Sequence, residues 1–385
     1  MKDLLVIHGG APTAVMNASL CGVVKEARRH GEIGRILGAS GGTGGAMREE
    51  FIDLTDLTDA QLEKLLHTPA SAIGTSRDPL YEKEYARLRE VFLQHNIGYV
   101  LFNGGNGTMD ACGHTRDACA QDDVRVVGIP KTIDNDIAVT DHAPGFGSAA
   151  KYLAATVAEV TRDVRALPIH VCILEAMGRN AGWLTAASAL ARDCGSGPDL
   201  IYLPERAFDE AQFLKDVQRI HEEKGGVVVV ASEGLHYADG TPIVEPIFRT
   251  ERAVYFGDVG AHLCSTVIKH LGIKARSEKP GICGRASDAW QSDVDREEAV
   301  ACGEEAVRLA AAGRSGVMVT LTHPEMGGTG KLGCADVHEV MMVERKLPDD
   351  FINEAGNDVT QAYLDWLRPL VGGGLPEYAI LEGRG

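Results

Sequence analysis

The stretch VRVVGIPKTIDNDI, residues 124–137, carries the clearest structural signal in this chain of 385 residues. Its apolar half, Val124–Ile129, predicts a buried strand that ends at the following proline. The polar half places Asp134 and Asp136 two residues apart, in a segment too short and too polar to be core. If this segment is extended, the hydroxyl of Thr132 lies on the same face as both carboxylates. Such a group at a strand end suits a magnesium ion and a general base, whereas a solvated turn with a capping aspartate is the plainer alternative.

Two other predicted strands run into glycine-rich turns. Leu4–Ile7 leads into HGGAPT at residues 8–13, and Gly98–Phe102 leads into NGGNGTMD at residues 103–110. A helical pattern follows each turn, and the amides at the start of a helix can cradle a phosphate, although a Gly-Gly turn is by itself more often structural. Neither turn matches a Walker A loop or a dinucleotide-binding fingerprint. Because parallel strands end at one edge of a sheet, we expect both turns and the aspartates to border one ligand crevice.

The composition narrows the class of protein. A length of 385 residues favours two domains, and a net charge of −17 disfavours nucleic acid and anionic membranes as partners. No apolar run approaches the length of a membrane span, so no membrane partner is expected. The nine cysteines are scattered and lack a Cys-x-x-Cys pair, which disfavours zinc sites and disulfide frameworks and favours the cytoplasm.

Alternating strands and helices predict an α/β fold with two doubly wound, Rossmann-like domains. Further strands are expected at Ile33–Ala39, His170–Leu174, Asp199–Leu203, Gly226–Ala231 and Val317–Thr322. Helices are expected at Ala14–His30, Leu62–His67, Tyr81–Asn96, Ala149–Asp163, Val254–His270 and Glu297–Ala312. Two loops are expected as well, a flexible glycine-rich loop at residues 40–45 and a cationic loop at residues 274–285.

A series of motifs resembles the phosphofructokinase family and occurs in the order typical of that family. It consists of Gly9-Gly10 with Ala11-Pro12 and Met16-Asn17, Gly74-Thr75-Ser76-Arg77, Gly104-Gly105-Asn106-Gly107-Thr108, Pro130–Asp136, Pro144–Ala149, Met177-Gly178-Arg179, Ser232-Glu233-Gly234, and Arg276 with Arg285. These motifs span roughly the first three quarters of the chain. The Thr-Ile-Asp-Asn-Asp motif combined with Met-Gly-Arg is highly specific, whereas the glycine turns alone are not.

The resemblance implies the phosphofructokinase fold, in which the active site lies in the cleft between two Rossmann-like domains. Residues 1–143 are then expected to form an N-terminal α/β domain with the phosphoryl-donor and magnesium site. Residues 144–343 are expected to form a second α/β domain with the sugar-phosphate site. Residues 344–385 are expected to form a C-terminal helical extension that packs on the body of the protein.

The resemblance also implies a role for each matching residue. Asp134 is expected to take the proton from the 1-hydroxyl of fructose 6-phosphate, Thr132 to contact the transferred phosphoryl group, and Arg179 to stabilise its charge. Magnesium, the one cofactor implied, is assigned to Asp136 and Asn106. The donor is assigned to Gly9, Gly10, Arg77, Gly105, Asn106, Gly107, Thr108 and Lys131. The sugar phosphate is assigned to Met177, Gly178, Glu233, Arg285 and Arg276, the last reaching in from a neighbouring subunit.

Three departures from the family pattern bear on the donor and the acceptor. Asn106 stands where ATP-using members usually have Asp, and an amide cannot give magnesium a negative charge. Lys131 resembles the pyrophosphate-using branch, because an ammonium can pair with pyrophosphate oxygens, whereas Gly107 resembles ATP-using members. His170 and Ile282 stand where bacterial ATP-using enzymes carry Arg and His against the 6-phosphate, which leaves another sugar phosphate or a polyol as acceptor.

The sequence therefore predicts a magnesium-dependent phosphotransferase of glycolysis that uses pyrophosphate and fructose 6-phosphate. The alternatives are an ATP-dependent 6-phosphofructokinase, a kinase for a related sugar, or a non-catalytic sensor of sugar phosphates or nucleotides. The expected partners are small molecules, a phosphoryl donor and a sugar phosphate. The expected assembly is a homodimer or homotetramer in the cytoplasm.

Overall fold

The computed structural model describes residues 1–249 and 254–381, which form two compact units. Unit 1 consists of Met1–Ala149, Arg285–Arg345 and Pro369–Gly372. Unit 2 consists of the described parts of Ala150–Gly284, Lys346–Arg368 and Gly373–Gly385. The chain first leaves unit 1 after Ala149, slightly beyond the expected boundary at residue 143. Residues 285–345 return to unit 1, although residues 285–343 were expected in the second domain and residues 344–345 in the C-terminal extension.

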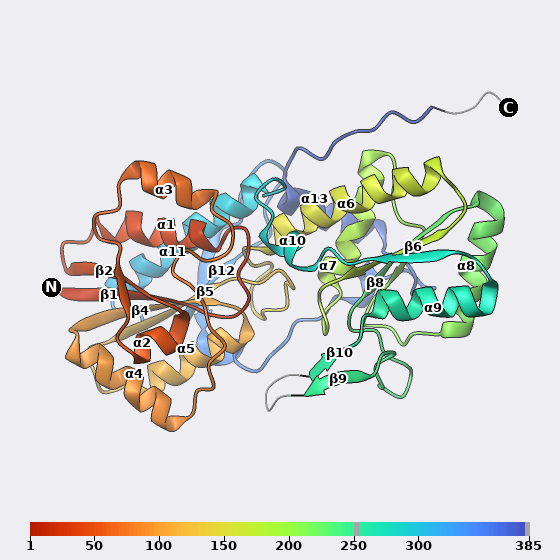
Figure 1. Cartoon of the computed structure of the whole chain (residues 1–385). Coiled ribbons are helices and arrows are strands. Elements are labelled where there is room, and N and C mark those ends of the chain that lie inside the picture. Colours follow the sequence, from red (N-terminus) through yellow and green to blue (C-terminus); the bar gives the residue numbers. More distant parts are fainter. Residues whose placement is uncertain (250–253, 382–385) are drawn as a thin grey trace. The chain divides into compact units, whose positions relative to one another are not determined.

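A seven-stranded sheet with the order β13-β12-β5-β4-β1-β2-β3 forms the centre of unit 1 (Figure 1). Its inner strands are parallel, while β3 and β13 are antiparallel edges. The strands are β1 Lys2–His8, β2 Ile33–Ala39, β3 Phe51–Asp53, β4 Ile97–Gly104, β5 Arg125–Pro130, β12 Val317–Leu321 and β13 Leu332–Asp336. The helices are α1 Met16–Ala27, α2 Gly42–Met47, α3 Asp59–Leu66, α4 Glu82–Gln94, α5 Asn106–Ala118, α11 Asp293–Ala311 and α12 Val337–Val340.

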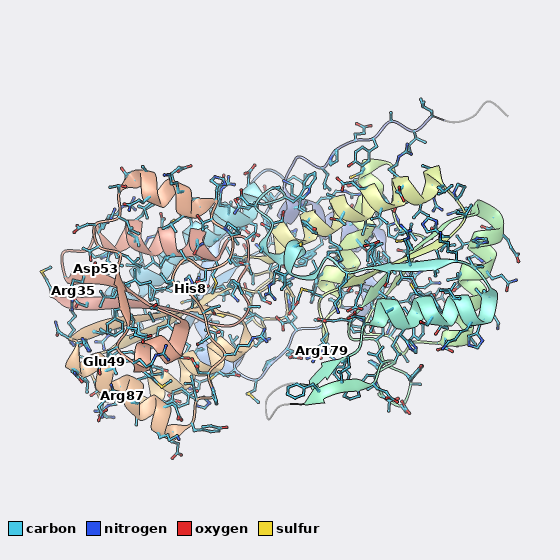
Figure 2. All side chains as sticks on the ribbon, in the orientation of Figure 1. His8, Arg35, Glu49, Asp53, Arg87 and Arg179 are labelled. Atoms are coloured by element: carbon cyan, nitrogen blue, oxygen red, sulfur yellow. The ribbon has the colours of Figure 1, made fainter. Side chains whose placement is uncertain are left out.

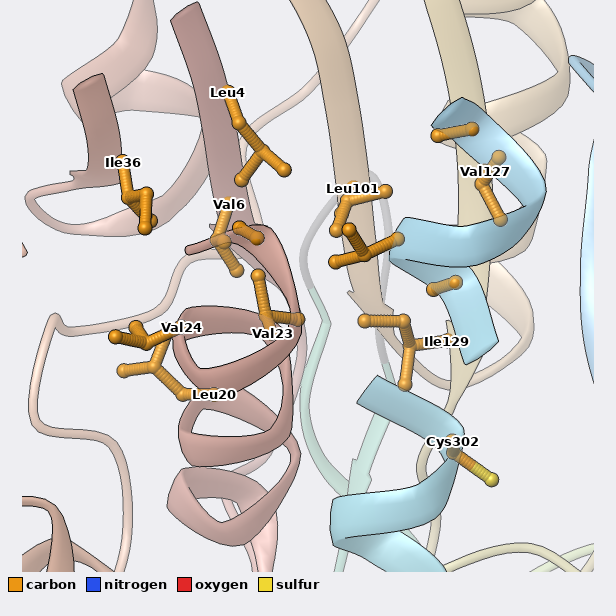
Figure 3. Packing of buried hydrophobic residues seen from close by; sticks show 14 of the residues in the cluster. Leu4, Val6, Leu20, Val23, Val24, Ile36, Leu101, Val127, Ile129 and Cys302 are labelled. Carbon is orange, nitrogen blue, oxygen red and sulfur yellow. The ribbon is translucent and has the colours of Figure 1, made fainter. Parts of the chain in front are cut away.

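Alternate residues of β1 point to opposite faces of this sheet and are buried on both. Leu4 and Val6 pack with α1 and α11, whereas Leu5 and Ile7 pack with α4 and α5. Figure 3 shows the first of these cores, with side chains from β1, β4, β5 and the two helices in contact range. A strand covered by helices on both faces reads as one continuous apolar run, which is why the sequence predicted the inner strands well.

Helix α11 belongs to unit 1 because it packs closely on α1, although nearly the whole chain separates them. A Cβ atom on Gly22 would lie 2.0 Å from the carbonyl oxygen of Val300, and one on Gly303 would lie 2.1 Å from that of Ser19. Glycine at both positions therefore allows the two backbones to touch. This contact explains why residues 285–345 complete the first unit.

Unit 2 contains a four-stranded parallel sheet, β11-β6-β8-β7, and a separate hairpin, β9-β10. The strands are β6 Val171–Ala176, β7 Leu200–Tyr202, β8 Val227–Ser232, β9 Pro246–Arg249, β10 Val254–Phe256 and β11 Ala275–Glu278. The helices are α7 Trp183–Ala187, η1 Ser188–Cys194, α8 Glu210–Lys224, α9 Val259–Leu271 and η2 Asp349–Phe351. Helices α6 Phe146–Ala166, α10 Gly281–Ala286 and α13 Gln361–Val371 have residues in both units.

Three local predictions from the sequence were wrong. Residues 254–256 are a strand rather than the start of a helix, because they pair with β9, and α9 begins only at Val259. Residues 274–285 form β11 and α10 rather than a loop, since β11 gains a partner in β6. The glycine-rich stretch at 40–45 leads into helix α2, which is largely buried and whose first turn is fixed by Asp78 hydrogen bonds to Thr43 and Gly44.

Within the described residues, no helix has both the length and the apolar character to cross a bilayer. All nine cysteines are free thiols, and only Cys283 is exposed.

Unit 1 buries a cluster of charges beside the segment that follows β5. His142 lies between two carboxylates, with Nε2 at 2.7 Å from Glu298 and Nδ1 at 3.1 Å from Asp141. Although burial opposes a charge on the ring, these two carboxylates raise the pKa of His142 to about 9. His323 also contacts Asp141, and the carboxylate of Glu298 accepts a hydrogen bond from the Gly330 amide. The imidazolium thus ties α11 to the 140–143 segment.

We predict that stability decreases as the pH rises from about 6.5 to about 9. Below pH 6.5, the unfolded pKa, the folded and the unfolded protein both bind the proton of His142, and above the folded value neither does. Between these limits only the folded protein binds it, so the stabilisation by His142 is lost as the pH rises, by an amount on the order of 2–3 kcal/mol. Urea unfolding of the wild type and of His142→Gln at both ends of this range measures the effect. A pH dependence as steep in the variant as in the wild type would refute it.

Candidate active site

The carboxyl ends of β1, β4 and β5 meet at one edge of the unit 1 sheet, as the sequence predicted. His8 is paired with Asn103, and Gly104 with Pro130. The ladder continues beyond the strands, because the Gly9 amide donates to the Asn103 carbonyl at 2.9 Å and the Lys131 amide donates to the Gly104 carbonyl at 3.1 Å. These hydrogen bonds bring the two glycine turns and the segment from Lys131 onward together.

The two glycine turns enclose the side chain of Thr108. A Cβ atom on Gly9 would lie 2.3 Å from the Thr108 hydroxyl oxygen, and one on Gly104 only 2.1 Å from it. Gly10 has a φ of +75°, and its amide donates to the carbonyl of Ser76 at 3.0 Å. Thr108, expected to bind the donor, therefore packs between the two turns.

Helix α5 begins directly at the second glycine turn. Gly105 caps it without a side chain, so the first amides of the helix, at Asn106 and Gly107, face outward with the positive end of the helix dipole. A Cβ atom on Gly107 would meet no atom within 4 Å. Packing therefore does not require glycine at this position, and the space in front of the helix start is open.

Lys131 is buried at the junction of the turns, and its ammonium donates to the carbonyl of Ala11 at 2.6 Å. Burial lowers its pKa to about 8, an effect that Asp134 opposes and that Arg77 and Arg285 reinforce. Burial and the nearby Arg77 also lower the pKa of Arg285. Lys131, Arg77 and Arg285 are thus close enough to influence one another, with the carboxylates of Asp134 and Asp136 nearby, and this concentration of positive charge suits a polyanionic ligand.

The segment that carries the aspartates is a turn rather than the extended strand considered from the sequence. Asn135 has a φ of +52°, in the left-handed region. The Thr132 hydroxyl donates to the carboxylate of Asp136 at 3.2 Å and accepts a hydrogen bond from the Asp134 amide at 3.0 Å. The Thr132 hydroxyl therefore contacts the Asp136 carboxylate and the Asp134 main chain through this turn rather than through strand alternation.

Asp136 and Asn106 form a pair of oxygen-bearing side chains that fits a magnesium ion. Asn106 donates its amide hydrogens to the carboxylate of Asp136 at 2.9 Å, while its own Oδ1 is buried and accepts no hydrogen bond from any described residue. Burial and the nearby Glu344 raise the pKa of Asp136. A cation would relieve both the orphan oxygen and the buried carboxylate. No described cluster contains three or more His, Cys, Asp or Glu side chains in metal-binding range.

In unit 2, two loops at the ends of β6 and β8 interlock. The Ser232 hydroxyl donates to the carbonyl of Gly178 at 2.8 Å, and the Gly178 amide donates to Glu233 at 3.3 Å. A Cβ atom on Gly234 would lie 1.7 Å from the carbonyl oxygen of Arg179, so only glycine fits there. Burial raises the pKa of Glu233. The predicted sugar-binding residues Gly178 and Glu233 are therefore in direct contact.

Arg179 packs on an aromatic ring that the sequence had not singled out. Its guanidinium carbon lies 5.0 Å from the ring centroid of Phe256, the last residue of β10. Arg179 is labelled in Figure 2. A cation over an aromatic face is stabilised by the ring's electrons and held in a narrow range of orientations. The signal in the sequence was too weak to find Phe256, because this residue precedes Gly257 in a stretch expected to be helical.

Two further residues predicted to bind the sugar phosphate take no part in the Gly178–Glu233 contact within the described residues. Arg276 lines a pocket of about 430 Å³ with His170, at the opposite end of β6 from Gly178. Burial and Arg276 lower the pKa of His170, so the ring is neutral near pH 7. Arg285 belongs to unit 1, in the group of cations around Asp134.

The C-terminal part of the chain supplies a residue that sequence reasoning missed. Nothing catalytic was expected beyond Val343, yet Arg345 donates hydrogen bonds to the carbonyls of Asn135 and Thr140, on either side of Asp136. Burial lowers the pKa of Arg345 to about 10, so it stays charged at neutral pH. An isolated arginine after a helix carries no motif, so its contact could be found only from the fold.

Several known proteins are similar to this chain over nearly its whole length. The profile of the family described as Phosphofructokinase matches residues 3–310. A pyrophosphate--fructose 6-phosphate 1-phosphotransferase of Rhodospirillum rubrum is 39% identical over 99% of this chain and 97% of its own length. A sulfofructose kinase of Alkalicoccus urumqiensis is 33% identical over 94% of each chain. The crystal structure of a pyrophosphate-dependent phosphofructokinase from Nitrosospira multiformis has a TM-score of 0.89 at 35% identity, covering 100% of this chain and 94% of that one.

The packing around Thr108 gives a prediction for two nearby glycines. Gly104→Ala should lower the free energy of unfolding by about 1–3 kcal/mol, because the new methyl group collides with Thr108 and with the carbonyl of Gly9. Gly107→Ala should change it by less than about 1 kcal/mol, because the methyl group enters open space at a helix start. Urea unfolding of both variants measures the difference, and equal stability would show that the turns relax around Thr108.

Proposed function

The chain belongs to the phosphofructokinase family, and we propose that it transfers a phosphoryl group from pyrophosphate to the 1-hydroxyl of fructose 6-phosphate, giving fructose 1,6-bisphosphate. The observation that carries this proposal is the buried ammonium of Lys131 at the junction of the glycine turns. Relatives named as pyrophosphate-dependent enzymes, similar over nearly the whole chain, support it.

The donor would be held at the edge of the unit 1 sheet. The amides at the start of α5 can donate to phosphate oxygens, and the cations Arg77 and Lys131 can neutralise them. Gly9 and Gly10, whose amides are bonded to the Asn103 and Ser76 carbonyls, would let the donor approach their turn closely because they carry no side chain. When the phosphoryl group leaves, negative charge builds up on the remaining phosphate. An ammonium already in place stabilises that charge at no cost in reorganisation.

Asp134 would act as the general base. Its position near Lys131 and Arg285 favours the ionised carboxylate, which can take the proton from the attacking hydroxyl. The Thr132 hydroxyl would redirect its single O–H from the Asp136 carboxylate to an oxygen of the moving phosphoryl group. Arg179, oriented by Phe256, would balance charge on that group.

Asp136 and Asn106 would hold a magnesium ion, which when bound neutralises the donor oxygens. Two protein ligands are sufficient for this metal, because magnesium keeps several waters and binds substrate phosphates directly. The orphan Oδ1 of Asn106 is the feature that favours its inclusion.

The sugar would be held by Met177, Gly178 and Glu233 in unit 2, with Arg285 contributing to its hydroxyls. Arg276, which lies in its own pocket, is proposed to serve the 6-phosphate site of a second subunit, so a homodimer or homotetramer is the proposed assembly. A cytoplasmic location is proposed from the free cysteines and the acidic net charge of −17.

A second candidate is a kinase for a sulfonated sugar, in line with the sulfofructose kinase among the relatives. A sulfonate carries one negative charge, against about −1.5 to −2 for a phosphate monoester at neutral pH, and so requires fewer cations. The pocket around Arg276 contains a neutral His170, and Ile282 offers no charge. The open space at Gly107 would also admit a nucleotide in place of pyrophosphate.

A screen of two donors against two acceptors tests both candidates. Purified protein with magnesium is assayed with pyrophosphate or ATP, each with fructose 6-phosphate or sulfofructose. We expect pyrophosphate with fructose 6-phosphate to give a kcat/KM at least about 10-fold above every other pair. Turnover with ATP alone would overturn the donor assignment, and a preference for sulfofructose would overturn the acceptor assignment.

The variant Lys131→Met shows whether the ammonium acts as proposed. We expect kcat with pyrophosphate to fall by about 100- to 1,000-fold, because one preorganised charge is lost. A methionine has a similar length and keeps the site filled. If the variant keeps a near-normal kcat, the charge at Lys131 does not stabilise the departing phosphate.

A further inference from the structure

A short segment from the last third of the chain, residues 344–345, crosses the turn that carries Asp134 and Asp136, and we call this segment the strap. Glu344 forms an antiparallel bridge with Ile137. The next amide, that of Arg345, donates to the carbonyl of Asp136 at 2.8 Å. The strap and the turn both belong to unit 1, although about 200 residues separate them in sequence.

The guanidinium of Arg345 donates hydrogen bonds to the same turn. Nη1 donates to the carbonyl of Thr140 at 2.9 Å, while Nη2 and Nε donate to the carbonyl of Asn135 at 3.1 and 3.3 Å. Together with its own amide, Arg345 therefore contacts three carbonyls of the turn, those of Asn135, Asp136 and Thr140. The planar fork of arginine can span two carbonyls in this way, and the single ammonium of lysine cannot hold both in the same geometry.

The turn has a conformation that its own residues do not favour. Asn135 and Val139 have φ values of +52° and +67°. Asparagine tolerates the left-handed region, but a β-branched valine rarely adopts it. Such a conformation persists only where the surrounding structure fixes it. Arg345 is the side chain that bridges the two ends of this strained segment, from Asn135 to Thr140.

We propose that Arg345 is a positioning residue that holds the 134–140 turn in the conformation needed for phosphoryl transfer. Its guanidinium fixes the carbonyls on both sides of Asp136, and this sets the directions of the Asp134 and Asp136 carboxylates. The inference rests on the proposed function, since it assigns Arg345 to the same site. It predicts an effect on the rate of the chemical step rather than on substrate binding, because the substrates contact the carboxylates and not Arg345.

The chain offers a matched control at Arg28. This guanidinium also donates to backbone carbonyls, those of Thr55 and Leu57, through Nε and Nη2. Arg28 lies at the end of α1 and touches none of the residues assigned to the active site. A loss of activity that follows from weakened backbone contacts in general would appear in Arg28→Lys as well.

The experiment compares Arg345→Lys, Arg345→Gln and Arg28→Lys with the wild type in the full-length protein. For both Arg345 variants we expect kcat to fall by about 10- to 100-fold with KM for each substrate within about 3-fold, because the reacting groups are misplaced but binding groups remain. Hydrogen exchange of the amides between residues 134 and 143 should accelerate by about 10-fold or more. Arg28→Lys should change neither quantity by more than about 2-fold.

Three outcomes would contradict the proposal. One is a normal kcat in both Arg345 variants, which would mean that the turn keeps its geometry unaided. Another is an equal loss in Arg28→Lys, which would assign the effect to general stability. The third is unchanged hydrogen exchange at 134–143 despite a lower kcat. Hydrogen exchange needs no substrate, so it still tests the positioning role if the wild type shows no turnover and the proposed function fails.

Discussion

The main-chain hydrogen bonds that extend the β1-β4-β5 ladder beyond its strands are the constraint on which the site depends. Gly9 bonds to Asn103, and Lys131 bonds to Gly104, so three chain segments far apart in sequence start from fixed positions at one sheet edge. Thr108 fills the space between the two turns, which is possible only because Gly9 and Gly104 carry no side chains. This sheet edge therefore positions the two glycine turns and Lys131, which are assigned to the donor.

The conformation of the segment after β5 depends on hydrogen bonds from other parts of the chain. Its neighbour, residues 144–148, is held by the buried Asp295 of α11, whose carboxylate accepts hydrogen bonds from the amides of Gly145 and Ser148 at 2.8 and 2.9 Å. Residues 135–140 are held by Arg345, which donates hydrogen bonds to the carbonyls of Asn135 and Thr140. Both supports come from residues 285–345, so the chain's return to unit 1 serves the site as well as the core.

The sequence predicted the parts of the fold that are determined locally. The apolar strands and the glycine turns were found because each has its own pattern. The contact of Thr132 with the Asp136 carboxylate arises through a turn rather than through the alternation expected from the sequence. The contacts of α11, Phe256 and Arg345 could not be predicted, because they depend on segments that meet only after folding. The same is true of β10 and β11, whose strand state is decided by pairing with β9 and β6.

The central claim is that Asp134 is the base in a phosphoryl transfer, and one comparison tests it most directly. The turnover of the wild type and of Asp134→Ala is measured with saturating pyrophosphate and fructose 6-phosphate, after urea unfolding has shown that both are folded to the same extent. A positioned base is worth about 100- to 10,000-fold, so the variant should lose activity by that factor. A near-normal rate in the folded variant would remove Asp134 from the mechanism.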